Sequence, residues 1–227
     1  MSQHANIIGK SRINIFIGEF GSGKTELAVN YSIALAKSGH KTAIVDFDLA
    51  KPICRTRESR ELLERSDVIV VAPEQHLAHS DLPVMPSNLI RVLYDRECNV
   101  VIDVGGGDSA IVLGQINQQL SENGYQAQLV INTLRPFTNT AENIVNMLKR
   151  IEGVSRLKVS SLICNTNLAQ ETTAEHISNG LKTVESAAQA LALPISFVVV
   201  PEWLENKISV PYPLFLLTPY TKYPWMG

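Results

Sequence analysis

The sequence predicts an α/β fold: a mainly parallel sheet of about seven strands with helices on both faces, a three-layer α/β/α arrangement. Short runs of valine, isoleucine and leucine alternate along the chain with longer segments of helical pattern. Uniformly apolar strands are typical of parallel sheets that are buried on both faces. Polar and glycine residues follow the ends of several of these strands, which is the edge where ligands bind in such sheets.

The expected strands are the apolar runs that stop at polar or turn-forming residues. They span residues 12–17, 41–46, 67–71, 99–103, 127–132, 157–164 and 195–200. Helices are expected between them, at residues 26–36, 58–65, 88–97, 109–122, 140–152 and 172–191. Gly39 suits the left-handed conformation that ends the first helix, and Pro52 keeps residues 49–57 out of a regular helix. Residues 72–86, which include three prolines, are expected to form a long loop.

The composition excludes several classes of protein. The 227 residues are 45% hydrophobic and carry a net charge of −2, so a normal core is available and nucleic acid could bind only at a local basic patch. Three widely spaced cysteines argue against a disulfide framework or a local zinc or iron–sulfur site. His76 and His79 could bind a metal, but a solvated loop is the favoured interpretation. Without a bilayer-length apolar run or a signal pattern, we expect a cytoplasmic protein.

Residues 18–25, Gly-Glu-Phe-Gly-Ser-Gly-Lys-Thr, fit the phosphate-binding P-loop pattern G-x-x-x-x-G-K-[ST] between the first strand and the first helix. Glycines allow a tight bend that aims backbone N–H groups at one anion, and the helix N-terminus adds partial positive charge. Lys24 is expected to reach the β- and γ-phosphates, and the Thr25 hydroxyl to hold Mg²⁺. The alternative is an accidental glycine-rich turn. The nucleotide-binding residues expected here are Gly18, Gly21, Ser22, Gly23, Lys24, Thr25 and Glu26.

Asp103 closes the fourth apolar strand and is followed by Gly105, Gly106 and Gly107. Its carboxylate is expected to hold the Mg²⁺ shell across from Thr25. The three glycines form the expected switch, because one of their N–H groups can bond the γ-phosphate and release it on hydrolysis. The plainer interpretations are a helix-capping aspartate and a tight glycine turn.

Asp46 and Asp48 stand at the end of the second strand. Asp48 is the candidate for orienting or deprotonating the attacking water, and with Lys24 it forms the expected catalytic pair, since phosphoryl transfer depends mostly on positioning and charge neutralisation. Two residues apart on a strand, both carboxylates face the same side. One can therefore hold Mg²⁺ or the loop while the other acts on water. The alternative for either is a strand-end turn former.

The order of these motifs resembles the MinD/ParA/nitrogenase-iron-protein group of dimerising P-loop ATPases (the CobQ/CobB/MinD/ParA nucleotide-binding domain) over about residues 12–205. Val45–Leu49 is similar to that group's second-strand motif. The resemblance implies that Asp48 activates water, that Asn165 contacts adenine and that Pro201 packs beside the base. It also implies ATP and Mg²⁺ as cofactors and a homodimer in the ATP state.

Two features depart from this group. The group usually carries a second lysine directly after the first P-loop glycine, which reaches the phosphates of the partner subunit, and here that position is Glu19. Glu19 could point outward, pair with a basic residue, or mark weak or lost hydrolysis. Replacement cations are available at Lys51, Arg55, Arg57 and Arg135. The cysteine pair that bridges a cluster in the nitrogenase iron protein is also missing.

The leading hypothesis is an ATP-binding molecular switch with slow Mg²⁺-dependent hydrolysis that acts on a protein partner. The alternatives are a nucleotide sensor with little or no hydrolysis, a P-loop ligase or amidase of small-molecule metabolism, and a metal-delivery GTPase. No N-K-x-D sequence is present to read guanine, which favours adenine.

The expected organisation has three parts. Residues 1–11 are a flexible lead-in, residues 12–209 the nucleotide-binding domain, and residues 210–227 a tail rich in proline and tyrosine. The tail is not expected to form regular structure. It binds a protein partner, pads the dimer or packs on its own domain, and its single lysine does not favour a basic amphipathic membrane helix.

Overall fold

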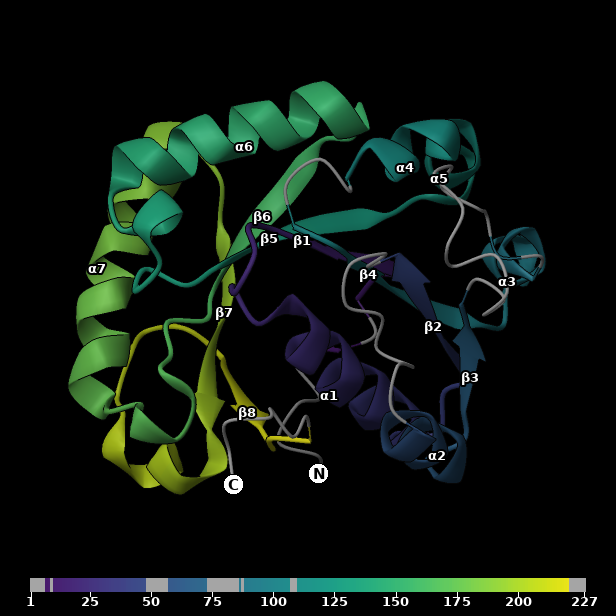
Figure 1. Ribbon diagram of the computed structural model, residues 1–227, viewed down its shortest axis with the longest axis horizontal. Coiled ribbons are helices and arrows are strands. Elements are labelled where there is room, and N and C mark those ends of the chain that lie inside the picture. The colour runs from purple at the N-terminus through teal and green to yellow at the C-terminus, as the bar shows by residue number, and fades with distance from the viewer. Residues whose placement is uncertain are drawn as a thin grey trace.

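The computed structural model describes residues 7–8, 10–47, 57–72, 86, 88–106 and 110–220. In this part of the chain eight strands form one parallel sheet in the order β3-β2-β4-β1-β5-β6-β7-β8 (Figure 1). The strands are β1 (Ile13–Ile17), β2 (Thr42–Phe47), β3 (Val68–Val71), β4 (Asn99–Val104), β5 (Gln126–Ile131), β6 (Val159–Cys164), β7 (Ile195–Pro201) and β8 (Leu214–Leu217). The predicted α/β class with a parallel sheet is confirmed.

The helices cover both faces of this sheet. They are α1 (Lys24–Lys37), α2 (Arg57–Arg65), α3 (Leu89–Tyr94), α4 (Ile111–Gln115), α5 (Asn117–Asn123), α6 (Ala141–Ser155) and α7 (Ala174–Leu191), with short 3-10 turns η4 (Pro136–Thr138), η5 (Ala169–Glu171) and η6 (Glu202–Lys207). One hydrophobic cluster lies between the sheet and α1 and α2, and the other between the sheet and α3 to α7 (Figure 1). The three layers expected from the sequence are present.

Successive residues of the central strand β1 point into different layers, which explains why the strand is apolar throughout. Ile15 and Ile17 belong to the cluster beneath α3 to α7, whereas Phe16 belongs to the cluster beneath α1 and α2. This alternation follows from the twofold period of a strand. Because β1 lies between β4 and β5, the loop that leaves its carboxyl end is surrounded by the ends of neighbouring strands.

The tail beyond residue 210 corrects the sequence prediction, because Leu214–Leu217 forms the eighth strand on the open edge of β7. Phe215 is fully buried and its ring packs against the rings of Phe197 and Tyr31. The expectation of an irregular tail rested on its prolines, which flank the strand and leave its interior free to pair.

Two predicted helices differ in extent, and two other predicted segments lie almost wholly outside the described residues. The helix expected at residues 109–122 is divided at Ile116 into α4 and α5, and Gly114 lowers helix propensity just before that point. The helix expected at residues 88–97 ends at Tyr94. The irregular segment and the proline-rich loop, with His76 and His79, lie outside the described residues apart from their end positions. None of the helices described is both long and apolar enough to cross a membrane.

Candidate functional site

The P-loop connects β1 to α1 and approaches β5 and the residues that follow β6. Gly23 has a φ of 82°, and a Cβ at this residue would clash with the side-chain amide of Asn165. A Cβ at Gly18 would clash with the carbonyl oxygen of Val130. The loop therefore needs glycine both for its conformation and for its close approach to neighbouring strands.

Lys24 and Ser22 equip the loop for an anion. Lys24 Nζ donates to the carbonyl oxygen of Glu19 (2.9 Å), which places the ammonium group across the loop. Ser22 Oγ is buried and has no hydrogen-bond partner within the described structure. Helix α1 begins at Lys24 without a side-chain cap, and an uncapped helix N-terminus attracts phosphate. The loop has the charge and the donors that a phosphate requires.

Three oxygen-bearing side chains meet beside the loop at the place expected for Mg²⁺. Thr25 Oγ1 donates to Asp103 Oδ2 (2.7 Å). Asp46 is the register partner of Asp103 across β2 and β4, and both carboxylates are buried, with 2% and 0% of their surface exposed. No cluster of three or more histidine, cysteine or acidic residues occurs among the described residues. Mg²⁺ in nucleotide sites, however, is held by one or two carboxylates together with phosphates, so Thr25, Asp46 and Asp103 fit it.

The first two glycines of the predicted switch follow β4 and lie against the P-loop. Gly105 follows the strand directly, and a Cβ at Gly106 would lie 2.7 Å from the backbone nitrogen of Phe20. The backbone of this segment therefore touches the loop that would hold the phosphates. Gly107 and the predicted water-orienting Asp48 lie outside the described residues.

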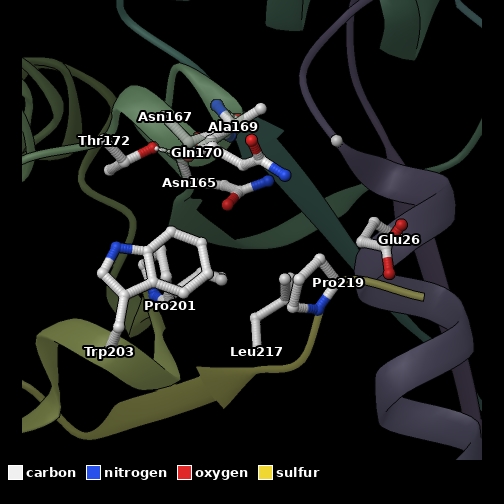
Figure 2. Close-up of a pocket in the computed structure, with 12 residues that line it drawn as sticks. Glu26, Asn165, Asn167, Ala169, Gln170, Thr172, Pro201, Trp203, Leu217 and Pro219 are labelled. Carbon is white, nitrogen blue, oxygen red and sulfur yellow. Dashed lines mark hydrogen bonds between the residues drawn. The ribbon is translucent and has the colours of Figure 1, made fainter. Parts of the chain in front are cut away.

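A pocket opens beside the P-loop, with a volume of about 600 Å³ including its mouth. Figure 2 shows Asn165 and Gln170 on one side of it, Leu217 and Pro219 on the opposite side, and the ring of Trp203 at one end. Amides on one wall and apolar groups on the other suit a flat heteroaromatic ring with polar edges. Gly23, Glu26, Asn165 and Pro201, all predicted from the sequence, line this pocket.

Several lining residues were missed by sequence reasoning. They are Asn167, Ala169, Gln170, Thr172, Val199, Trp203, Leu217 and Pro219. Trp203 is 42% exposed and comes directly after the Pro201–Glu202 pair, so an aromatic residue next to a strand end was the available signal. Leu217 and Pro219 could not be found, because they belong to the tail that was expected to be irregular.

Asparagine side chains fasten the P-loop to the loops after β5 and β6. Asn165 Nδ2 donates to the carbonyl oxygen of Ser22 (2.7 Å). Asn132 Nδ2 donates to the carbonyl oxygens of Asn167 (3.0 Å) and Gly21 (3.4 Å). Asn165 thus supports the loop as well as the pocket. Next to it, burial raises the pKa of the Cys164 thiol to about 11, so this thiol stays protonated near neutral pH and serves packing.

Glu19, which stands in place of the signature lysine, forms an ion pair within its own chain. Arg150 Nη2 on α6 lies 2.6 Å from Glu19 Oε2. Of the replacement cations named from the sequence, Arg135 reaches the loop, where its Nε donates to the carbonyl oxygen of Gly21 (3.2 Å). Lys51 and Arg55, and the side chain of Arg57, lie outside the described residues. Of the three expectations for Glu19, the structure therefore contains the ion pair with a basic residue.

A phosphate loop at the carboxyl edge of a parallel sheet, beside a ring-sized pocket, defines a P-loop nucleotide-binding protein. The chain belongs to the CobQ/CobB/MinD/ParA nucleotide-binding domain family, whose model matches residues 15–209. This match confirms the resemblance drawn from the sequence motifs. A comparison with curated protein sequences gives no match.

Three solved structures of similar fold are a signal recognition particle 54 kDa protein and two FtsY proteins. The signal recognition particle 54 kDa protein from Aeropyrum pernix K1, in complex with GDP, has a TM-score of 0.55 and 19% identity over 87% of this chain and 43% of that chain. FtsY from Thermotoga maritima has a TM-score of 0.56 and 16% identity, covering 88% and 65%. Chloroplast FtsY from Physcomitrella patens has a TM-score of 0.55 and 15% identity, covering 87% and 62%. At these identities the likeness concerns the fold alone, and this chain spans less than two thirds of each.

Proposed function

We propose that this chain is an ATP-dependent molecular switch with slow Mg²⁺-dependent hydrolysis, which acts on a protein partner in the cytoplasm. The observation that carries the proposal is the hydrogen bond between Thr25 and Asp103 (2.7 Å). It sets the last P-loop residue against the strand that leads into Gly105 and Gly106. Hydrolysis of the γ-phosphate would therefore occur next to a glycine backbone that can change conformation in response.

The residues divide the chemistry among them. Lys24 and the N-terminus of α1 neutralise and orient the phosphates. Thr25, Asp46 and Asp103 would hold Mg²⁺, which supplies further neutralisation of the phosphate charge when bound. Asp48, which follows β2 directly in the sequence, orients the attacking water. Slow turnover follows from the absence of a lysine at the position of Glu19.

The choice of ATP rests on the chemistry of the pocket. Guanine presents two neighbouring N–H donor groups on its Watson–Crick edge, which a carboxylate accepts well, whereas adenine presents one donor and one acceptor, which suit an amide. After β6 the chain has Asn165-Thr166-Asn167-Leu168, so the lysine and aspartate of the guanine-reading sequence are replaced by Thr166 and Leu168. Asn165, Asn167 and Gln170 supply amides to the pocket. The carboxylate of Glu26 also lines it, and its Oε1 already accepts hydrogen bonds from Tyr220 N and Asn30 Nδ2.

A second candidate function is a nucleotide sensor that binds ATP with little or no hydrolysis. The ion pair between Glu19 and Arg150 favours it, because it fills the position of the trans-acting lysine with a group that stays within its own subunit. A turnover assay separates the two candidates: release of phosphate above the rate of Asp48→Ala supports the switch, and equal rates support the sensor.

Calorimetric titration with ATP and with GTP, each with Mg²⁺, tests nucleotide binding. We expect ATP to bind at least tenfold more tightly than GTP, and Lys24→Ala to weaken ATP binding at least a hundredfold, because it removes the cation that crosses the loop. Lys37→Ala, in the exposed last turn of the same helix, is the control and should bind as the wild type does. A preference for GTP would overturn the assignment of ATP, and undiminished ATP affinity in Lys24→Ala would overturn the P-loop site.

A further inference from the structure

The segment from Leu214 to Tyr220, called here the C-terminal strap, is fixed to the P-loop helix by side chains. The amide of Asn30 pairs with the backbone of Thr218 in both directions: Thr218 N donates to Asn30 Oδ1 (2.9 Å) and Asn30 Nδ2 donates to Thr218 O (2.9 Å). Tyr220 N donates to Glu26 Oε1 (2.6 Å). The amide of Asn30 thus pairs with the backbone just after β8 in the way a neighbouring strand would.

Both anchoring side chains are buried and stand one turn apart on α1. Asn30 Nδ2 also donates to Glu26 Oε1 (3.3 Å), so the two anchors are joined to each other. Glu26 follows Thr25 directly in the sequence. The strap is therefore bonded to the residue next to one that is expected to hold Mg²⁺. A backbone N–H bonded to a carboxylate is among the stronger hydrogen bonds in proteins, and a segment held in this way keeps a fixed position.

The strap is also bonded to the turn that follows β7. Thr218 Oγ1 donates to Glu202 Oε1, and Glu202 begins the 3-10 turn that carries Trp203. Leu217 and Pro219 of the strap line the pocket across from Asn165 (Figure 2). The strap therefore forms the apolar wall of the pocket and links α1 with the turn after β7.

We infer that Glu26 and Asn30 are positioning residues for the nucleoside: by holding the C-terminal strap they set an apolar wall against the base, while the P-loop binds the phosphates. This inference rests on the proposed function and deepens it, since it gives residues of the same helix two different roles in binding the nucleotide. Lys24 and Thr25 act on phosphates directly. Asn30 acts on the base through the strap, and so does Glu26, which also lines the pocket itself. Loss of the strap anchors should weaken the binding of a nucleoside triphosphate and spare a phosphate chain that has no base.

Two ligands and three variants test this inference. Calorimetry with Mg²⁺ compares ATP with inorganic tripolyphosphate, which occupies the phosphate site alone. Asn30→Ala removes the paired amide, and Tyr220→Pro removes the N–H that Glu26 accepts. Tyr220→Ala keeps that N–H and loses the ring, so it is the matched control. We expect about a tenfold loss of ATP affinity in Asn30→Ala and Tyr220→Pro, a smaller loss in Tyr220→Ala, and tripolyphosphate affinity within twofold of the wild type throughout.

Retained tripolyphosphate binding also shows that each variant is folded. Unchanged ATP affinity in Asn30→Ala and Tyr220→Pro would overturn the inference, and so would an equal loss for both ligands, because the anchors would then act through the P-loop. Failure of the wild type to bind either ligand would instead overturn the proposed function, and the inference with it. The two failures are therefore distinguishable in one experiment.

Discussion

Glu19 brings a negative charge into a loop that has to bind a polyphosphate, and Arg150 offsets it. The pair joins a carboxylate that is 14% exposed to an arginine that is 52% exposed. An ion pair this open contributes at most about 1 kcal/mol to folding. Its importance is electrostatic and local, because the pair cancels the charge of Glu19 beside the position of the phosphates.

The charge balance predicts the behaviour of Arg150→Ala. Without the arginine, Glu19 repels the triphosphate, and we expect ATP affinity measured at low salt to fall about threefold to tenfold, with a smaller effect at high salt. Glu19→Gln added to Arg150→Ala should restore the affinity. Lys149→Ala removes the same charge from the neighbouring exposed position of α6 and serves as the control. If Arg150→Ala and Lys149→Ala bind ATP alike, the pair has no such role.

Among the elements, the P-loop depends on glycine for two separate reasons, and the chain contains a control for one of them. Gly23 and Gly39 have similar φ angles, 82° and 85°. A Cβ at Gly23 would clash with Asn165, whereas a Cβ at Gly39 would meet nothing within 4 Å. Substitution at Gly39 therefore measures the backbone strain alone, and substitution at Gly23 measures the strain together with the crowding.

Chemical denaturation should separate these two effects. Gly39→Ala is expected to lower the free energy of unfolding by about 1–2 kcal/mol, the cost of a left-handed conformation. Gly23→Ala should lower it by at least about 1 kcal/mol more, because the methyl group overpacks against Asn165, and should also reduce ATP affinity. Equal losses of stability in the two variants would show that the loop yields to the methyl group.

Most of the strands and helices were predicted from the sequence. Continuous apolar runs located the strands, because burial on both faces demands them, and the strand ends pointed to the site. β8 was missed because Pro211, Pro213 and Pro219 dominate the composition around four apolar residues. Its pairing partner is the outer edge of β7, and sequence pattern alone does not show which strand has an edge left to pair.

Long-range contacts mark the limit of prediction for the site. Glu19 and Arg150 are 131 residues apart in the sequence, and Glu26 and Tyr220 are 194 apart. Each pair meets only in the folded molecule, where Arg150 on α6 reaches the P-loop and Tyr220 after β8 reaches the start of α1. The P-loop could be identified because its chemistry lies in eight consecutive residues, whereas these partners have no local pattern.

For the molecule as a whole, we predict a homodimer that forms with ATP. The P-loop face carries two exposed aromatic rings, Phe20 and Phe137, which are 58% and 69% exposed. Rings so placed can be covered by a second copy facing the loop. Light scattering of Asp48→Ala, in which we expect hydrolysis to be blocked, should give about twice the 25.0 kDa chain mass with ATP and Mg²⁺ and the chain mass with ADP. A single mass under both conditions would contradict the dimer.

The hydrogen bonds between the C-terminal strap and α1 have a consequence for synthesis on the ribosome. The P-loop and its helix α1 are complete after residue 37, yet the strap that bonds to this helix ends at Tyr220. Protein chains emerge from the N-terminus onward, so the phosphate loop is made early and one wall of the nucleoside pocket is made late. Contacts between such distant segments are also slow to form. If the strap positions the base as proposed, a growing chain therefore has a complete pocket only after residue 220 has been translated.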